Sequence, residues 1–291
     1  MNNKEKTVRV KRQSAFLETL RLTIKSPSAR LGAILFLLVV VLSLLAPLIA
    51  PYSPTDLDVK SIAKPPSASH IFGTDHMGRD IFSRILYGGR YSLALGVCSS
   101  LLGALIGIVF GCVAGYFGGA TETLIMRLMD VLSALPSLLL CILLSSALGK
   151  GFFNTVLALT IGSIPQGVRM MRAQILSERS REYVEAAESI NCSKLSIMFR
   201  HLLPNAISPM IVVTTMGIGS TIMSSSSLSF IGLGVQPPTP EWGAMLSDAR
   251  SHMLNSQYMM LFPGLFIAIT ILAINLLGDG LRDALDPKLR N

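Results

Sequence analysis

The residues of this sequence that are best suited to chemistry do not form a recognisable catalytic pattern. A hydrolase inside a membrane would need a nucleophile with a base or a set of metal ligands, yet no HExxH occurs around the four histidines. A GxGD pair would need glycine where Leu276 stands before Asp279. A phosphate-binding loop around Lys150 would need glycine at Leu144 and Ser or Thr at Gly151. We therefore expect this chain not to be an enzyme and not to hydrolyse ATP.

Two histidines, His70 and His76, lie near Asp75 in a polar stretch and raise the question of a metal site. No further ligand stands at a firm spacing, so we expect solvated loop residues and no metal ion. The cysteines are isolated, and most lie in apolar stretches, which argues against disulfides and CxxC metal sites. We expect them to be small packing residues: Cys98, Cys112, Cys141 and Cys192.

Composition indicates a chain that crosses a membrane several times. Hydrophobic residues make up 51% of it, charged residues only 14%, and the mean hydropathy is +0.56. The net charge of +8 lacks the basic runs with interleaved aromatics that nucleic-acid binding needs, so we expect no nucleic-acid partner. The basic residues cluster beside apolar spans, which indicates membrane topology and contact with lipid.

The fold class expected from the apolar runs is all-α, a polytopic membrane bundle of about six helices. Pro165 with Gln166, in the fourth run, and Pro136, in the third, suggest broken helices beside a solute path or ordinary kinks. The expected spans are 31–50, 92–116, 124–148, 152–168, 206–231 and 258–277.

The expected division of the chain follows these spans. Residues 1–30 are a basic arm in which Phe16, Leu20 and Ile24 suit a helix in the headgroup layer, with a disordered tail as the alternative for 1–12. The first span is too long for a typical signal peptide, so we expect it to be retained. The remaining parts are the first span with its loop, the core and the tail: 31–90, 91–280 and 281–291.

Two residue patterns inside the spans suggest packing or solute contact. Glycines recur every fourth residue at Gly103, Gly107, Gly111, Gly115 and Gly119 and predict close approach of another helix. A run of hydroxyls in the fifth span could line a wet route for a polar solute or serve helix contact. Its candidate path residues are Ser220, Thr221, Ser224, Ser225 and Ser227.

One charged segment, at about 178–205, stands out from the apolar chain. Its apolar residues recur at helical spacing and predict a helix lying against something outside the lipid: Val184, Ala187, Ile190 or Asn191, Leu195, Met198 and Leu202. Asparagine tolerates the left-handed conformation that ends a helix, so Asn191 predicts a sharp bend between two short helices.

The spacing of Glu185, Ala186 and Ala187 from Asn191 and Pro204 resembles the EAA loop of permease subunits in ATP-binding-cassette (ABC) importers. The resemblance implies a cytoplasmic coupling helix seated in a groove of the ATPase subunit, within the type I importer permease fold. On the helix pattern alone, an ordinary interfacial helix is the alternative. The family usually has glycine where this chain has Asn191.

Three further stretches resemble the dipeptide, oligopeptide and nickel branch of those importers: 72–93, 228–246 and the end of the chain. The resemblance implies a second homologous permease, two ATPase subunits that bind the ATP and Mg²⁺, and an extracytoplasmic solute-binding protein. It implies di- or oligopeptide import, with glutathione or nickel chelates as alternatives. Within 228–246, Trp242 suits an anchor at the membrane interface.

Charge distribution gives a topology that is independent of the resemblance. Placing both termini and the EAA loop in the cytoplasm puts most of the 25 lysines and arginines on the cytoplasmic side of a bacterial inner membrane. An ion-coupled secondary transporter is the alternative from another class. It would need a carboxylate or histidine deep in a span, and Asp130 lies too near a span end to serve.

Overall fold

The computed structural model describes residues 22–285 and contains helices joined by loops, with one isolated β-bridge between Thr74 and Asp80. The helices are α2 Pro27–Leu44, α3 Ala46–Ile49, η1 Val59–Ser61, α4 Ile81–Phe117, α5 Gly119–Leu132, α6 Ser137–Leu148, α7 Phe152–Arg179, α8 Glu182–Ser189, α9 Lys194–Ser196, η2 Ile197–Leu202, α10 Leu203–Ala206, α11 Ser208–Phe230, α12 Trp242–Ala249, η3 Arg250–His252 and α13 Tyr258–Leu285. The headgroup-layer helix expected around Phe16 and Leu20 lies outside the described residues.

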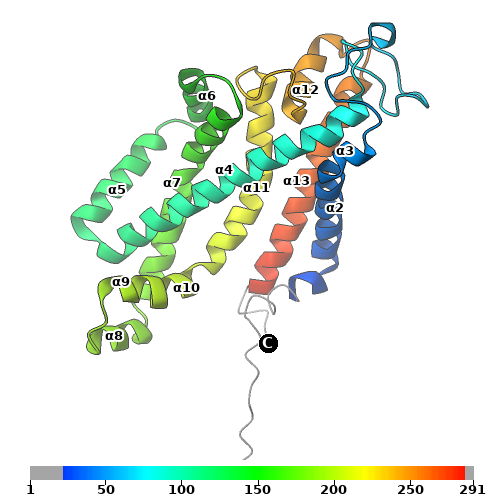
Figure 1. The fold of residues 1–291 in the computed structure, drawn as a ribbon. Coiled ribbons are helices and arrows are strands. Elements are labelled where there is room, and N and C mark those ends of the chain that lie inside the picture. Colours follow the sequence, from blue (N-terminus) through cyan, green and yellow to red (C-terminus); the bar gives the residue numbers. More distant parts are fainter. Residues whose placement is uncertain (1–21, 286–291) are drawn as a thin grey trace, which may run out of the picture.

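The fold is an all-helical, polytopic membrane bundle, as the composition predicts. Among the described residues, α2, α4, α11 and α13 are long and apolar enough to cross a membrane, and the bent pair of α5 and α6 makes a fifth candidate. The span expected at 152–168 is the first part of α7, which is long enough but less apolar. Figure 1 shows α7 running through the same layer as its neighbours.

The expected third span is broken. Helices α5 and α6 meet at an angle of 82°, and Pro136 stands directly before the first residue of α6. Proline has no N–H and disfavours helical conformation in the residue before it, so the helix ends there. Ion pairs from Arg169, 3.0 Å from Asp130, and from Arg172 to Glu122 hold α5 beside α7.

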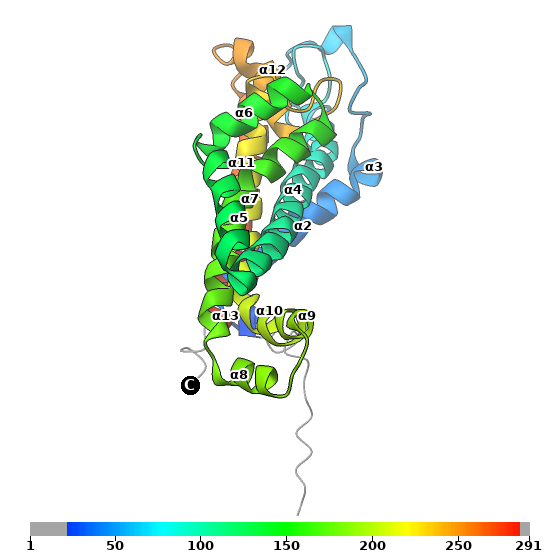
Figure 2. The same ribbon diagram turned by 90° about the vertical axis from the view of Figure 1, so that its left-hand side faces the viewer.

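The long helices separate two ends of the molecule. Figures 1 and 2 both show α8, α9 and α10 beyond the same end of the bundle as the start of α2 and the close of α13. We call residues 182–206 the elbow. The opposite end carries residues 50–80 and 231–257, which we call the loop end.

Close helix contacts depend on glycine at several points. The first and last spans lie side by side, because a Cβ on Gly32 would stand 2.6 Å from the carbonyl oxygen of Ala273, and Gly280 lies directly against Ala29. A buried apolar cluster joins these helices to α4 and α12 near the loop end, and Trp242 and Ile85 are among its members. The loop end is therefore packed onto the bundle.

Candidate functional site

The elbow contains the sharp bend that the sequence predicts. Helix α8 ends after Ser189, and Asn191 has a φ of 57°, in the left-handed region. The N–H of Cys192 donates to the carbonyl of Ala187 at 3.1 Å, and the N–H of Asn191 donates to Glu188 at 2.9 Å. These bonds satisfy carbonyls that the end of a helix leaves free. The chain then turns back into α9, η2 and α10.

One side of the elbow packs on its own chain. Val184, Ala187, Met198 and Leu202 are buried in a cluster with Tyr116 of α4 and with Met171 and Ile175 of α7. The side chain of Tyr183 donates to Glu178 at 2.8 Å, and burial together with that bond raises the pKa of Tyr183. The elbow is thus fixed to the C-terminal parts of α4 and α7.

The other side of the elbow is exposed and partly apolar. Ile190 is 76% exposed, Leu195 60% and Phe199 54%, although the predicted apolar stripe includes Ile190 and Leu195. Glu185 and Ala186 also face outward. Three exposed apolar side chains on one projecting segment are typical of a surface that a partner covers.

The placement of Ala187 corrects a sequence-based expectation. We expected both alanines to fit a groove of the ATPase subunit, but Ala187 is only 4% exposed and faces its own chain. Helical spacing explains the difference, since consecutive residues point about 100° apart, so Ala187 turns toward α4 and α7 while Ala186 faces outward. Pro204 is exposed and begins α10 with Leu203.

The glycine pattern packs α4 against α7 of the same chain. A Cβ on Gly107 would stand 2.9 Å from the backbone of Gly167, and one on Gly111 would stand 2.5 Å from Met171. Gly103 faces Ser163, and Gly115 faces Ile175. Gly119 does not belong to this contact, because it starts α5 with a φ of 57° and open space around it.

The hydroxyl run of α11 divides between two environments. Ser220 and Thr221 line a cavity of about 690 Å³ among α4, α7, α11 and α13. Ser225 is buried in the bundle. Ser224 and Ser227 are half-buried, and Ser227 donates to the carbonyl of Met223 at 2.9 Å. Only the first part of the run therefore faces the cavity.

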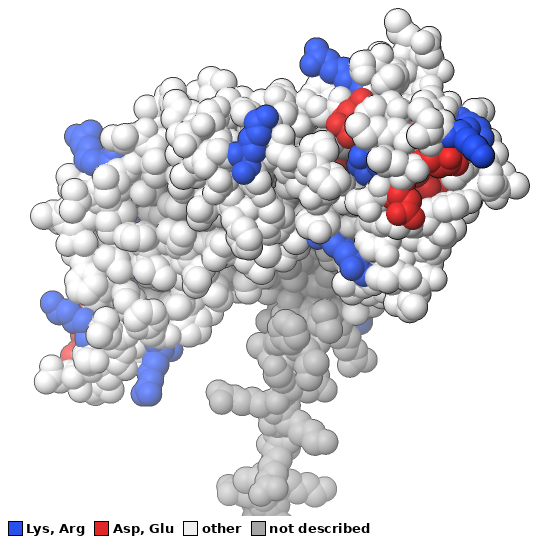
Figure 3. All heavy atoms as spheres, turned by 45° about the horizontal axis from the view of Figure 1, so that its top comes forward, with Lys and Arg blue, Asp and Glu red and all other residues white. Residues whose placement is uncertain are grey.

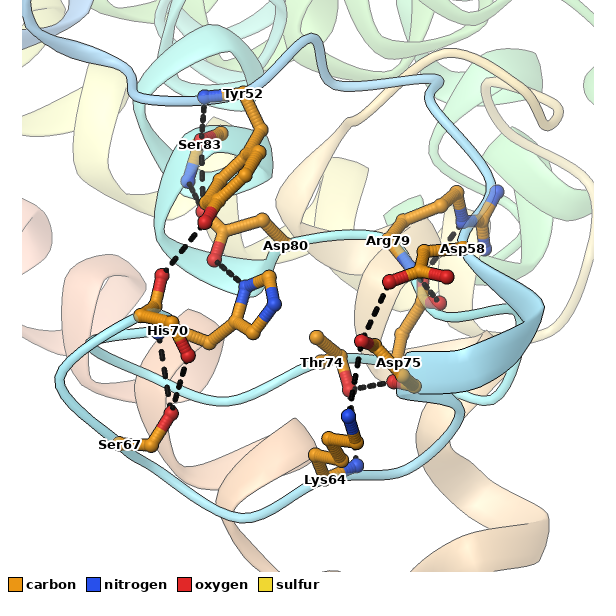
Figure 4. A network of polar contacts seen from close by, with 12 residues as sticks. Tyr52, Asp58, Lys64, Ser67, His70, Thr74, Asp75, Arg79, Asp80 and Ser83 are labelled. Atoms are coloured by element: carbon orange, nitrogen blue, oxygen red, sulfur yellow. Dashed lines mark hydrogen bonds and ion pairs between the residues drawn. The ribbon is translucent and has the colours of Figure 1, made fainter.

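The first loop is an ordered polar network, which corrects the expectation of solvated residues (Figure 4). His70 is buried with its Nδ1 3.0 Å from Asp80, and Tyr52 stacks on its ring at 4.9 Å. Asp75 accepts from Arg79 Nε at 2.6 Å and lies 3.6 Å from Arg84 Nε. The charged side chains of this loop therefore pair with one another and with α4 of the same chain.

The second loop joins this network. Asp248 of α12 lies 3.4 Å from Arg79, and the rings of His76 and His252 stack at 5.3 Å. No group of three metal-ligating side chains occurs within residues 22–285. Figure 3, which brings this end forward, shows acidic side chains gathered on one side of the face and basic ones scattered over it.

Trp242 is a core residue and not an interface anchor. It is fully buried, and its Nε1–H donates to the carbonyl of Ile85 at 2.9 Å. The preceding Glu241 is fully buried as well and accepts from Ala244 N–H at 2.8 Å and from Ser92 Oγ at 3.1 Å. Burial raises the pKa of Glu241, against the opposing effect of these hydrogen bonds.

Sequence reasoning missed two sets of residues. Asp75 and Arg79 stand four residues apart and form an ion pair, a spacing that is a readable signal for charge pairing. Asp80 and Arg84 have the same spacing but pair with His70 and Asp75 instead. The second is Asn275, whose carboxamide lines the cavity together with that of Gln166, a residue that the sequence already indicates beside a solute path or a kink. The signal for Asn275 is a strongly polar side chain inside an apolar span.

Comparison with known proteins matches the sequence to two family descriptions. Residues 107–291 match the binding-protein-dependent transport system inner membrane component, and residues 14–66 match the N-terminal transmembrane domain of oligopeptide transport permease C. The chain belongs to this family of permease subunits of ABC importers. It is a non-catalytic, multi-pass component of the inner membrane, and its family implies ATPase and binding-protein partners.

Individual relatives place the chain in the peptide and glutathione branch. It is 45% identical over 268 residues to the di/tripeptide transport system permease protein DppC of Pseudomonas aeruginosa, covering 90% of this chain and 88% of that one. It is 47% identical over 263 residues to the glutathione transport system permease protein GsiD of Escherichia coli, covering 90% and 87%.

Solved structures show the same fold at low sequence identity. A chain of the MetNI methionine ABC transporter in an inward-facing conformation matches with a TM-score of 0.56 and 17% identity, covering 70% of this chain and 97% of that one. An amino acid ABC transporter matches with a TM-score of 0.51 and 17% identity, covering 65% and 87%. The permease fold of these importers is therefore shared.

Proposed function

We propose that this chain forms half of the translocation path of an importer for di- or oligopeptides and that a second, homologous permease forms the other half. An extracytoplasmic binding protein delivers the solute, and two ATPase subunits bind the ATP and Mg²⁺ that drive transport. Relatives named for dipeptides, tripeptides and glutathione support this substrate class. Glutathione import is the second candidate, because the GsiD relatives are as similar as DppC; nickel chelates remain the third.

The orientation belongs to the same proposal. The elbow, the start of α2 and the end of α13 lie on the cytoplasmic side, and the loop end lies outside. The clustering of basic residues before α2 and around the elbow supports this arrangement. In this orientation the arm at 1–30 and the tail at 281–291 are cytoplasmic, while the core at 91–280 carries the path.

The observation that carries the coupling role is the exposed apolar side of the elbow. Force from an ATPase subunit must enter through a segment that projects from the bundle and is fixed to it, and the elbow meets both conditions. Ile190, Leu195 and Phe199 enter the ATPase groove, and Glu185 offers a carboxylate to a donor there. Ala186 lets the partner approach closely, while Ala187, Asn191 and Pro204 hold the shape of the elbow.

The test is a double substitution, Ile190→Ser with Phe199→Ser, in the reconstituted importer. Losing two buried apolar side chains from an interface costs about 3 to 6 kcal/mol, so solute-stimulated ATPase activity and uptake should fall together by more than tenfold. Membrane insertion and the affinity of the binding protein for its solute should not change.

The matched control is Leu254→Ser at the loop end, where a leucine is 88% exposed. This variant should keep its basal ATPase activity, because no ATPase subunit reaches that side. Full stimulated ATPase and uptake in the double elbow variant would show that the coupling assignment is wrong and that the elbow is only an interfacial helix.

A further inference from the structure

The cavity of about 690 Å³ has an uncharged lining. It contains hydroxyls, carboxamides, thioethers, aliphatic side chains and glycines, and no Asp, Glu, Lys, Arg or His from the described part of the chain. A path built to select a charged group would place an opposite charge in this lining. The cavity therefore has no side-chain charge with which to distinguish anionic from cationic solutes.

The polar groups of the lining differ in whether their hydrogen bonds are used. The hydroxyls are all engaged within the bundle: Ser100 with Thr221 at 3.0 Å, Ser163 to Thr160, Thr214 to Met210 and Ser220 to Gly217. The carboxamides of Gln166 on α7 and Asn275 on α13 have no hydrogen bond to any residue in 22–285. They are the unused donors and acceptors of this surface.

Gln166 is exposed and Asn275 is half-buried. Both carboxamides are therefore accessible and free to bond water or a solute. Each carboxamide carries two N–H donors and a carbonyl acceptor, which is the complement of a peptide bond with its own N–H and carbonyl. Ionised termini and metal chelates would instead be met by charged side chains.

We infer that Gln166 and Asn275 bind the backbone amides of a passing peptide, whatever its side chains. The thioethers of Met210, Met216 and Met223 also line the cavity, and methionine adapts its shape to varied apolar groups. Recognition here is by peptide bond and not by sequence or charge. This inference rests on the proposed function, because it names the part of the peptide that this path reads.

The test measures uptake by vesicles that contain the complete importer and its binding protein. The probes are trialanine, its Lys- and Asp-containing versions, and a trialanine in which an ester replaces one of the two peptide bonds. Gln166→Leu and Asn275→Leu should each lower uptake of the three peptides alike, by about fivefold, the effect of one lost hydrogen bond. The ratio of trialanine uptake to ester uptake should shrink by a similar factor. The same binding protein serves the variant and the unchanged importer, so comparing this ratio between them cancels selection by the binding protein.

Two further variants guard against simple misfolding. Gln166→Glu and Asn275→Asp keep the size of the side chain and add a negative charge, so uptake of the Asp-containing peptide should fall relative to the Lys-containing one. Gln174→Leu is the matched control, since Gln174 lies on the same helix but does not line the cavity; its uptake and ester ratio should equal those of the unchanged protein.

The outcomes separate this inference from the proposed function. If the unchanged importer transports none of the three peptides, the proposed function fails and this inference fails with it. If it transports them and both Leu variants keep full uptake and the same ester ratio, the carboxamides meet only water and the inference alone is overturned. The inference alone is also overturned if Gln166→Glu and Asn275→Asp leave the uptake of the Asp-containing peptide relative to the Lys-containing one unchanged.

Discussion

The two ends of the bundle differ in how fully the chain satisfies its own bonding groups. At the loop end, charges such as Asp75 and Arg79 are buried and paired, and Trp242 is enclosed with its N–H bonded. At the elbow, Ile190 and Phe199 project without cover from the described chain. The loop end thus pairs its charged side chains within this subunit although Leu254 there is 88% exposed, while the elbow presents an apolar surface to a partner.

The largest effect is expected where buried charges depend on one carboxylate. Asp75→Asn leaves Arg79 only its ion pair with Asp248 and leaves Arg84 without an ion pair among the described residues, and an uncompensated buried charge costs about 3 to 5 kcal/mol. Denaturant unfolding of the full chain in detergent micelles measures this loss. Asp56→Asn, an exposed carboxylate of the same loop, should change stability by no more than about 0.5 kcal/mol. Equal losses in both variants would mean that the network is not paired as described.

A second effect at the loop end depends on pH. The pKa of Glu241 is raised by burial, so its contribution to stability is present below about pH 4, where a free glutamate titrates, and is lost as pH rises through the raised value. The loss is about 1.4 kcal/mol for each unit of the rise. In Glu241→Gln this part of the pH dependence should vanish. Unfolding measured from about pH 4 to 8 tests it, and identical slopes in the two proteins would refute it.

A smaller effect is expected at the bend of the elbow. Asn191 has a φ of 57°, and a left-handed residue with a Cβ costs about 1 to 2 kcal/mol unless it is asparagine or glycine. Asn191→Ala should lower stability by about 1 kcal/mol, while Asn191→Gly should lose none of it. Unfolding of both variants in micelles decides the point, and a Gly variant as unstable as the Ala variant would contradict the role of the backbone.

The smallest effect separates the two sides of the elbow. Ile190→Ser should change the stability of the chain by less than about 0.5 kcal/mol, because Ile190 is exposed. Ile197→Ser should cost about 2 to 5 kcal/mol, because Ile197 is 2% exposed. The same unfolding experiment compares them. If Ile190→Ser were as costly as Ile197→Ser, the exposed side would already be packed within the subunit.

Features set by local geometry were predictable from the sequence. The glycines from Gly103 to Gly115 repeat at one helix face and lie against a helix, as small residues in lipid do. The bend at Asn191 follows from the tolerance of asparagine for left-handed backbone. Both depend on a few neighbouring residues, so a short stretch contains the information.

Features set by distant contacts were not predictable in this way. Trp242 suits either an interface or a core, and only its contact with Ile85, far away in the sequence, decides between them. The burial of His70 and Asp75 depends on how the first loop folds over α4 and α12. Identifying the outward side of the elbow requires knowing which elbow residues α4 and α7 cover.

The contact between the first and last spans can form only late in synthesis. Helix α2 ends at Leu44 and packs along α13, which begins at Tyr258. At about 5 to 20 residues per second a ribosome needs roughly 10 to 50 s to produce the chain between them. During that interval α2 can pack on α4, which follows it in the chain, but its face around Gly32 must contact lipid until Ala273 arrives. The bundle therefore closes only when translation is nearly finished.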